Sequence, residues 1–339
     1  MRIKRALVLS ALAATALGAL TVGASAADPP KIAVDLTTLT SPFWTAYNQY
    51  IVNEAKAQGV DLLQPFNSEF DTAKQITGVK NAITLGAKGL IFSPFDSSAA
   101  GTVLKAADAA KVAVVAVDVA PDSGPVAIVV RANNIAYGEK ACKYIGEHVA
   151  EGPIVQIMGD QASINGRDRG NGFRDCITKN YPKLKQLEIP TKAWSGEDAA
   201  AGLDTVLNST PGLKAIYMHA GGVFLAPTLQ TLKRKGMLHP AGDPDHIIIV
   251  SNDGIPQEFD AIRKGEADAT VSQPADLYAK YGIMYLKDAI EGKKFKAGPT
   301  DHDSTIVEVA PGVLEDQLPA QLVTKANVDD KSFWGNNPK

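Results

Sequence analysis

The chain has 339 residues, of which 45% are hydrophobic and 21% charged, a composition too apolar for a disordered protein and long enough for two hydrophobic cores. Its 34 Lys and Arg against 37 Asp and Glu give a formal net charge of −3, which argues against a nucleic-acid binder. The 2 cysteines are too few for a disulfide scaffold and form no CxxC zinc pattern.

The first 26 residues have the pattern of a secretory signal peptide. Arg2, Lys4 and Arg5 precede an uncharged run over residues 6–21, and small residues follow at Ala24-Ser25-Ala26. The sequence therefore predicts removal of residues 1–26 and a soluble protein in the periplasm. The cleavage site has no cysteine beside it for a lipid anchor, and no later run reaches the roughly 20 apolar residues of a membrane span.

Short apolar runs alternate with helical patterns along the rest of the chain. The predicted strands are residues 31–36, 61–64, 89–92, 113–117, 154–158, a run near Leu187, 215–219, 247–250 and 305–309. The predicted helices are residues 42–58, 71–85, 97–110, 135–150, 167–180, 199–207, 224–235 and 276–290. Apolar strands separated by helices indicate βαβ units and parallel sheets, which is an α/β fold.

The two halves of this pattern repeat one plan, so we expect two similar Rossmann-like lobes. The first lobe is predicted to comprise residues 31–133 plus 274–302, and the second residues 134–273 plus 303–339. The end of the chain, from Gln317, is expected to wrap a lobe through Phe333 and Trp334.

One aspartate stands at a strand end in each predicted lobe, Asp118 in the first and Asp253 in the second. Ligands of open parallel sheets bind beyond the carboxyl ends of the strands, so both side chains are expected to face a shared cleft. The alternative is that each aspartate only caps the turn that follows it.

Signature motifs of common enzymes are missing from the sequence, which has no GxSxG, GxxxxGK[ST], HExxH or GxGxxG. The five histidines stand at no metal-ligand spacing, so we expect neither a metal nor a cofactor. Polar and aromatic residues do gather at strand ends and helix starts, and aromatic faces with planar hydrogen-bonding groups suit a polyhydroxylated ligand. These residues are Trp44, Asp118, Arg167, Trp194, Asp253 and Gln273. Each of these residues also has a purely structural interpretation. Trp44 would then be part of the core, Arg167 a surface helix residue and Gln273 a hydrogen-bonding residue at a strand end.

Several segments in this order resemble the ribose-binding branch of the type I periplasmic sugar-binding proteins, the soluble receptors of ABC importers. They are SPFW at 41–44, SPFDSSA at 93–99, VVAVD ending at Asp118, GRDRGNGF at 166–173, IIIVSNDG at 247–254 and ATVSQPADLYAKYG at 269–282. The resemblance spans nearly all of residues 31–310.

The resemblance implies two lobes joined by three crossings of the chain and closing on a sugar. Carried over position by position, it assigns the sugar contacts to Ser41, Phe43, Trp44, Asp118, Arg167, Trp194, Asp253 and Gln273. Two positions depart from the family pattern: Val119 stands where an arginine is usual, and His219 is followed by Ala220 where a strand-end asparagine is usual. The ligand is therefore not assigned as ribose, and His219 is expected to replace one missing partner.

The expected function is that of a periplasmic solute-binding protein that delivers a pentose-like monosaccharide or a sugar alcohol to a membrane permease, as a monomer and without nucleic acid. The alternatives are an exported carbohydrate hydrolase using Asp118 and Asp253 as paired carboxylates, and a sugar or quorum-signal receptor for chemotaxis.

Cys142 and Cys176 fall in the first two helices of the second lobe. In the oxidising compartment to which a signal peptide leads, we expect them to form a disulfide. Two buried thiols are the alternative.

Overall fold

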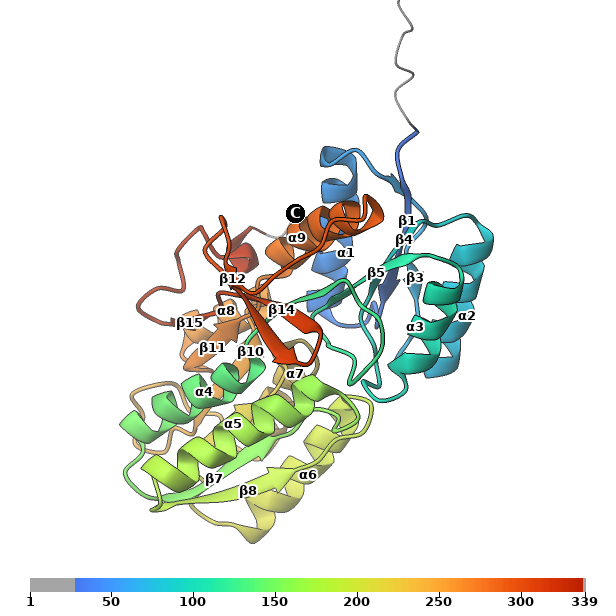
Figure 1. The fold of residues 1–339 in the computed structure, drawn as a ribbon. Coiled ribbons are helices and arrows are strands. Elements are labelled where there is room, and N and C mark those ends of the chain that lie inside the picture. The colour runs from blue at the N-terminus through green and yellow to red at the C-terminus, as the bar shows by residue number, and fades with distance from the viewer. Residues whose placement is uncertain (1–27, 338–339) are drawn as a thin grey trace, which may run out of the picture.

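The computed structural model describes residues 28–337, so the predicted signal peptide lies outside the described residues. Two α/β lobes, each built on one sheet, confirm the expected fold class (Figure 1). In chain order the elements are β1 (Lys31–Leu36), α1 (Pro42–Ala57), β2 (Asp61–Leu62), β3 (Phe66–Asn67), α2 (Thr72–Thr84), β4 (Gly89–Phe92), α3 (Ala100–Ala109), β5 (Ala113–Val117), β6 (Ile128–Ala132), α4 (Asn134–His148), β7 (Gly152–Ile157), α5 (Ile164–Asn180), β8 (Leu184–Ile189), α6 (Gly196–Ser209), β9 (Ala215–Met218), α7 (Gly221–Arg234), β10 (Ile248–Asp253), α8 (Pro256–Lys264), β11 (Ala269–Ser272), α9 (Ala275–Ile290), β12 (Gly298–Pro299), β13 (Thr305–Ala310), β14 (Val313–Leu318), β15 (Gln321–Thr324) and η1 (Trp334–Asn336).

The first lobe has a sheet in the order β12-β13-β14-β6-β5-β4-β1-β2, with β3 also paired to β1. The strands from β14 to β2 are parallel to their neighbours, whereas β12, β13 and β14 pair antiparallel. Helices α1 and α9 pack together on one side of this sheet, and α2 and α3 share the other core. The central strand β4 is buried along its whole length and β5 along all but its first residue, which is why their sequences are continuous apolar runs.

The second lobe has a sheet in the order β15-β11-β10-β9-β7-β8, parallel except for β15. One core lies under α4 and α5, and the other under α6, α7 and α8. Figure 1 shows this lobe at the lower left, with α4 and α5 running side by side across its sheet.

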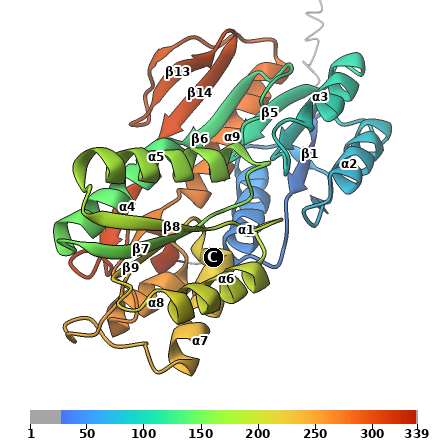
Figure 2. The ribbon, with the colours of Figure 1, turned by 90° about the horizontal axis from the view of Figure 1, so that it is seen from below.

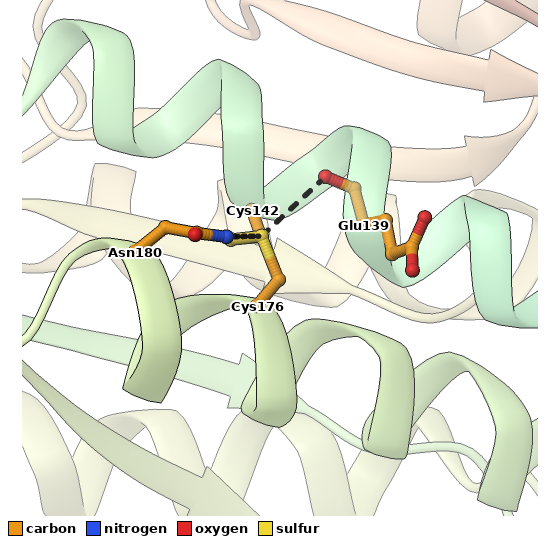
Figure 3. Close-up of a disulfide and its surroundings, with 4 residues drawn as sticks. All are labelled: Glu139, Cys142, Cys176 and Asn180. Carbon is orange, nitrogen blue, oxygen red and sulfur yellow. Dashed lines mark hydrogen bonds between the residues drawn. A yellow bond between two sulfur atoms is a disulfide. The ribbon is translucent and has the colours of Figure 1, made fainter.

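Helices α4 and α5 are joined by the predicted disulfide between Cys142 and Cys176, whose Cα atoms are 6.1 Å apart (Figure 3). The helices approach closely because glycines stand where they touch. A Cβ added to Gly138 would lie 2.2 Å from the carbonyl oxygen of Arg169, so a larger residue would push α4 and α5 apart. The expectation of a disulfide is thus confirmed, against the alternative of two buried thiols.

The chain crosses between the lobes three times: after β6, between β11 and α9, and between β14 and β15. The position of the last crossing shows that the expected boundary between the lobes was wrong in this part of the chain. Residues 303–318 were expected in the second lobe, but β14 extends the first sheet by pairing parallel with β6, from Glu315 opposite Val129 to Leu318 opposite Ala132 (Figure 2). Strand β13 forms an antiparallel hairpin with β14 and therefore also belongs to the first sheet. Only β15 and the tail follow the last crossing, and β15 pairs with β11 of the second sheet.

The tail contacts both lobes instead of wrapping one. The Trp334 ring packs edge-on against Phe43 of α1 at 6.1 Å, and its Nε1 donates to the carbonyl oxygen of Gln273 at 2.5 Å. The neighbouring Phe333 packs against Phe259 of α8 at 5.8 Å. Both aromatic side chains are buried, so the expected apolar packing of this pair is present at the boundary of the two lobes.

Candidate ligand-binding site

A pocket with an empty volume of about 510 Å³ lies between the lobes. Its walls come from the segments that follow the carboxyl ends of the strands, where the open-sheet rule places ligands. Seven of the sequence-predicted residues meet there: Ser41, Phe43, Trp44, Asp118, Trp194, Asp253 and Gln273.

The wall from the first lobe is mainly aromatic. Phe43 and Trp44 begin α1, where Pro42 at the first helical position starts the helix, and their rings meet edge to face at 5.3 Å. Phe70 and Phe95 follow β3 and β4 and form a second edge-to-face pair at 5.6 Å. Asp118, directly after β5, is the only charged residue among the described first-lobe residues that line the pocket.

The wall from the second lobe is mainly polar. Asp253 ends β10 and Gln273 follows β11, and the amide of Gln273 donates to Oδ1 of Asp253 at 2.8 Å. The backbone N–H of Gly222 donates to Oδ2 of Asp253, also at 2.8 Å. Both carboxylate oxygens of Asp253 therefore have a fixed donor, and their remaining lone pairs are available to a ligand.

Arg169, on α5, is the cation of the pocket. Its guanidinium is fully buried and donates to Asn134 Oδ1 at 2.6 Å, to the carbonyl oxygen of His219 at 2.5 Å and to Gln273 Oε1 at 3.0 Å. These are three of five available N–H bonds. The side chain is thus held rigidly, with donor capacity left for a ligand.

Three of the predicted site residues, Asp118, Trp194 and Asp253, hold an uncommon backbone conformation. Asp118 has φ of +64° and Asp253 has φ of +123°, a region that L-residues rarely occupy. Phe70 and Trp194, which also line the pocket, have φ of +57° and +55°. Such strain persists where surrounding structure enforces it and gathers at functional sites.

Burial changes the acidity of both carboxyl groups. It raises the pKa of Asp253 to about 6, although Arg169 and the hydrogen bonds from Gly222 and Gln273 act in the opposite direction. Burial also raises the pKa of Asp118, partly offset by the charges of Arg169 and Arg131 and by the hydrogen bond from Asn165. At neutral pH the Asp253 carboxyl is mainly ionised and therefore an acceptor.

Arg167 does not line the pocket. Its side chain is one-third exposed and pairs with Asp122 of the first lobe at 2.5 Å on the rim of the cleft. Residues two apart on a helix point in nearly opposite directions, so Arg167 and Arg169 cannot both face the pocket. The arginine of the pocket is the second one of the GRDRGNGF segment.

His219 does not line the pocket either, because its imidazole is buried behind the wall. The Gly159 N–H donates to its Nδ1 at 3.0 Å, so the proton sits on Nε2, which donates to Gln156 at 3.1 Å. Burial and the charge of Arg169 hold the pKa of His219 well below its usual range. The ring is therefore neutral, and only the His219 carbonyl contributes, through Arg169.

The sequence patterns left several lining residues unassigned, among them Phe70, Phe95, Ser163, Asn165 and Arg169. Ser163 is 1% exposed, and its Oγ has no hydrogen-bond partner among the described residues. A buried hydroxyl without a partner is costly, so the Ser163 Oγ is a free hydrogen-bonding group at the pocket wall. Ser163 is the N-cap of α5, yet its side chain makes no capping hydrogen bond.

The lobes approach each other closely at Gly222. A Cβ added there would lie 2.6 Å from Oγ of Ser41 in the other lobe, so a larger residue would displace this side chain. Within residues 28–337, no helix is long and apolar enough to cross a membrane, and no three His, Cys, Asp or Glu side chains are grouped to hold a metal.

Comparison with known proteins agrees with this geometry. A family model described as a periplasmic binding protein domain matches residues 32–294. The chain is 27% identical over 267 residues to the ribose import binding protein RbsB of Bacillus subtilis (strain 168), covering 78% of this chain and 82% of the relative. It is 29% identical to the D-allose-binding periplasmic protein of Escherichia coli (strain K12), covering 81% and 89%. A crystal structure of an ABC transporter solute-binding protein from Mycobacterium smegmatis, with bound glycerol, superposes with a TM-score of 0.76 at 26% identity, covering 88% of this chain and 96% of that chain.

Proposed function

The chain belongs to the periplasmic binding protein family, and from this premise we propose that it is the sugar-binding component of an ABC importer. Its ligand is a monosaccharide or a sugar alcohol, held between the two lobes. The family is one of binding proteins and not of enzymes, which sets aside the exported hydrolase. Asp118 and Asp253 are then ligand acceptors, not an acid–base pair.

The observation that carries this proposal is the opposition of a polar wall and an aromatic wall across one pocket. Hydroxyl groups of a sugar donate to Asp118 and Asp253 and accept from Arg169, while its C–H faces pack on rings such as Trp44 and Trp194. Ser41, Phe43 and Gln273 complete the set. Arg167 and His219 act only indirectly, for the reasons given above.

Neither wall alone can satisfy a polyhydroxylated ligand, so ligand shifts the protein toward its closed form by its differential affinity for that form. A micromolar Kd corresponds to about −8 kcal/mol. Hydrogen bonds to charged groups contribute about 1.5–3 kcal/mol each, so a few of them suffice after the cost of closure.

We further propose that the protein works in the periplasm as a monomer, after removal of residues 1–26, and that a membrane permease recognises its closed form. A chemotaxis receptor that reads the same closed form remains the second candidate partner. Neither role involves nucleic acid or a cofactor.

Calorimetry with D-ribose, D-allose, L-arabinose, glycerol and myo-inositol tests the proposal. We expect saturable binding of at least one compound, recovery of that compound unchanged, and a smaller radius of gyration by small-angle scattering. Absence of binding across sugars and polyols, or release of a product, would overturn it.

A further inference from the structure

Arg131 lies where the lobes meet, close to the pocket but outside its lining. It sits on β6 of the first lobe, and its side chain is 3% exposed. One amino group, Nη2, donates to Asn165 Oδ1 at 2.9 Å and to Asp168 Oδ2 at 3.0 Å, both on α5 of the second lobe. The other, Nη1, donates to Glu315 on the adjacent strand β14 at 3.4 Å. Arg131 therefore connects the two lobes.

The contact with Asn165 leads directly into the pocket. A guanidinium can only donate, so the amide oxygen of Asn165 must face Arg131. The amide nitrogen is thereby turned toward Asp118 and donates to its Oδ1 at 3.1 Å. Arg131 thus determines which end of the Asn165 amide meets Asp118, and leaves Oδ2 of that carboxylate for a ligand.

We propose that Arg131 is a positioning residue for ligand binding, which grips α5 as the lobes close and orients Asn165 toward Asp118. The proposal rests on the proposed function of the pocket, because it gives Arg131 a role in closing that pocket around a ligand. The proposal gives Arg131 a different role from Arg167, which joins the lobes only at the solvent-exposed rim. Exposed ion pairs contribute little, whereas a buried charge that loses its partner is strongly unfavourable.

Closure can be measured without any ligand. The Ser97 N–H donates to the carbonyl oxygen of Ala162 across the cleft at 3.1 Å, so these two residues lie side by side when the lobes are closed. Cysteines in the double variant Ser97→Cys/Ala162→Cys will form a disulfide under mild oxidant at a rate that reports how often the protein closes. Arg131→Lys and Asp168→Asn are then added separately to this background.

The matched control is Arg174→Gln. Arg174 is also on α5, but it pairs with Glu188 inside the second lobe at 2.8 Å and is 41% exposed. We expect trapping to slow at least threefold in Arg131→Lys and in Asp168→Asn, and to stay within 1.5-fold of the background in Arg174→Gln. Circular dichroism melts identify variants that fail to fold. Asp168, which is 21% exposed, gives the milder change if Arg131→Lys is unstable.

Binding of D-ribose, D-allose and myo-inositol to the same substitutions, without the added cysteines, completes the experiment. We expect at least fivefold weaker binding in both variants for any of these compounds that the wild type binds. Unchanged trapping in both folded variants would overturn the role of Arg131. Slower trapping without binding of any compound would support that role while contradicting the proposed sugar ligand.

Discussion

The two lobes share one βα plan but line the pocket with different chemistry. The first lobe contributes two aromatic pairs, Phe43 with Trp44 and Phe70 with Phe95, and a single charged side chain. The second lobe contributes a linked set of buried polar groups in which Arg169 and Gln273 hold each other. The difference indicates that the second lobe mainly orients the hydroxyl groups of a ligand, and that the first lobe, together with Trp194 of the second, covers its apolar faces.

The supports of the two walls differ as well. The polar wall belongs to the lobe that contains the disulfide, and hydrogen bonds fix the polar side chains of this wall. The aromatic wall is continuous with the core of the first lobe, since Phe43 and Trp44 also pack against buried residues of α1 and α9. Substitutions in the polar wall should therefore change affinity most, whereas those in the aromatic wall should change affinity and stability together.

The largest effect is expected at Asp253. Asp253→Ala removes an acceptor and leaves the amide of Gln273 and the N–H of Gly222 without their partner. We expect affinity for the best calorimetric ligand to fall by about 100-fold, which corresponds to about 3 kcal/mol. The exposed Asp245→Ala is the control and should match the wild type. A change of less than fivefold in Asp253→Ala would remove this carboxylate from the site.

The two arginines of α5 offer a matched pair within the polar wall. Arg169→Lys keeps the charge but loses the planar fork that reaches Asn134, His219 and Gln273 together. We expect about a 30-fold loss of affinity in Arg169→Lys and less than threefold in Arg167→Lys, since the latter lies on the rim. Equal losses in titration calorimetry would mean that the buried arginine is not the one that serves the ligand.

The two tryptophans of the pocket, Trp44 from the first lobe and Trp194 from the second, test the stacking of the ligand on aromatic rings. Trp44 is 8% exposed and packed against Phe43 and Tyr47, so Trp44→Ala should lower both affinity and melting temperature. Trp194 is only partly buried, so Trp194→Ala should reduce affinity about tenfold with a smaller change in melting temperature. Trp194→Phe is expected to recover most of the binding. Unchanged dissociation constants in both alanine variants would exclude stacking on these rings.

The raised pKa of Asp253, about 6, predicts opposite pH trends for binding and for stability. Below about pH 6 the carboxyl becomes protonated and loses acceptor capacity, so affinity should fall severalfold between pH 7 and pH 5. The pKa of Asp253 is higher in the folded than in the unfolded chain. Its contribution to folding stability is therefore fully present below the unfolded pKa and is lost as pH rises through about 6. Its contribution to the unliganded protein should therefore increase on acidification over the same range.

Asp253→Asn separates the two trends, because it cannot titrate. Calorimetry and thermal melts of this variant from pH 5 to pH 7 should show a smaller pH dependence than the wild type in both quantities. The residual dependence then belongs to other buried carboxyls, such as Asp35, whose pKa burial raises to about 7. Identical profiles in the two proteins would contradict the assignment to Asp253.

The smallest effect on binding is expected from the disulfide. Cys142→Ser/Cys176→Ser opens a link across 34 residues between two side chains that do not line the pocket. The chain-entropy model then predicts a loss of about 3–4 kcal/mol in the free energy of unfolding. Affinity should stay within twofold of the wild type if the polar wall is held by its own hydrogen bonds. A large loss of affinity in a folded variant would show that the link also positions α5.

Much of this architecture was predictable because it depends on local patterns. The strands over residues 31–36, 89–92 and 113–117 have the predicted bounds, since a buried parallel strand is a short apolar run between helices. Asp118 and Asp253 were recognisable as cleft residues because a strand end is itself a local feature. The cysteines were expected to pair because both fall on consecutive helices of one lobe.

Other features were decided only by tertiary structure. Strand β6, α8, β11, β14 and β15 escaped prediction because charged residues or short length obscure their patterns. Arg131 on β6 is buried with partners on α5 of the other lobe, and Glu315 on β14 is buried against Arg131, so both depend on partners that no local window contains. The placement of β14 in the first sheet depends on which sheet edge its backbone reaches after a long excursion of the chain.

The same distinction explains the pocket. The sequence by itself determined that strand ends of two lobes carry aromatic and polar groups for a common ligand, because these positions follow from the order of strands and helices. Only the packing of α5 against α4 decided that Arg169 faces inward and Arg167 outward. The face of a helix that meets a cleft depends on its rotation about its own axis, and its neighbours set that rotation.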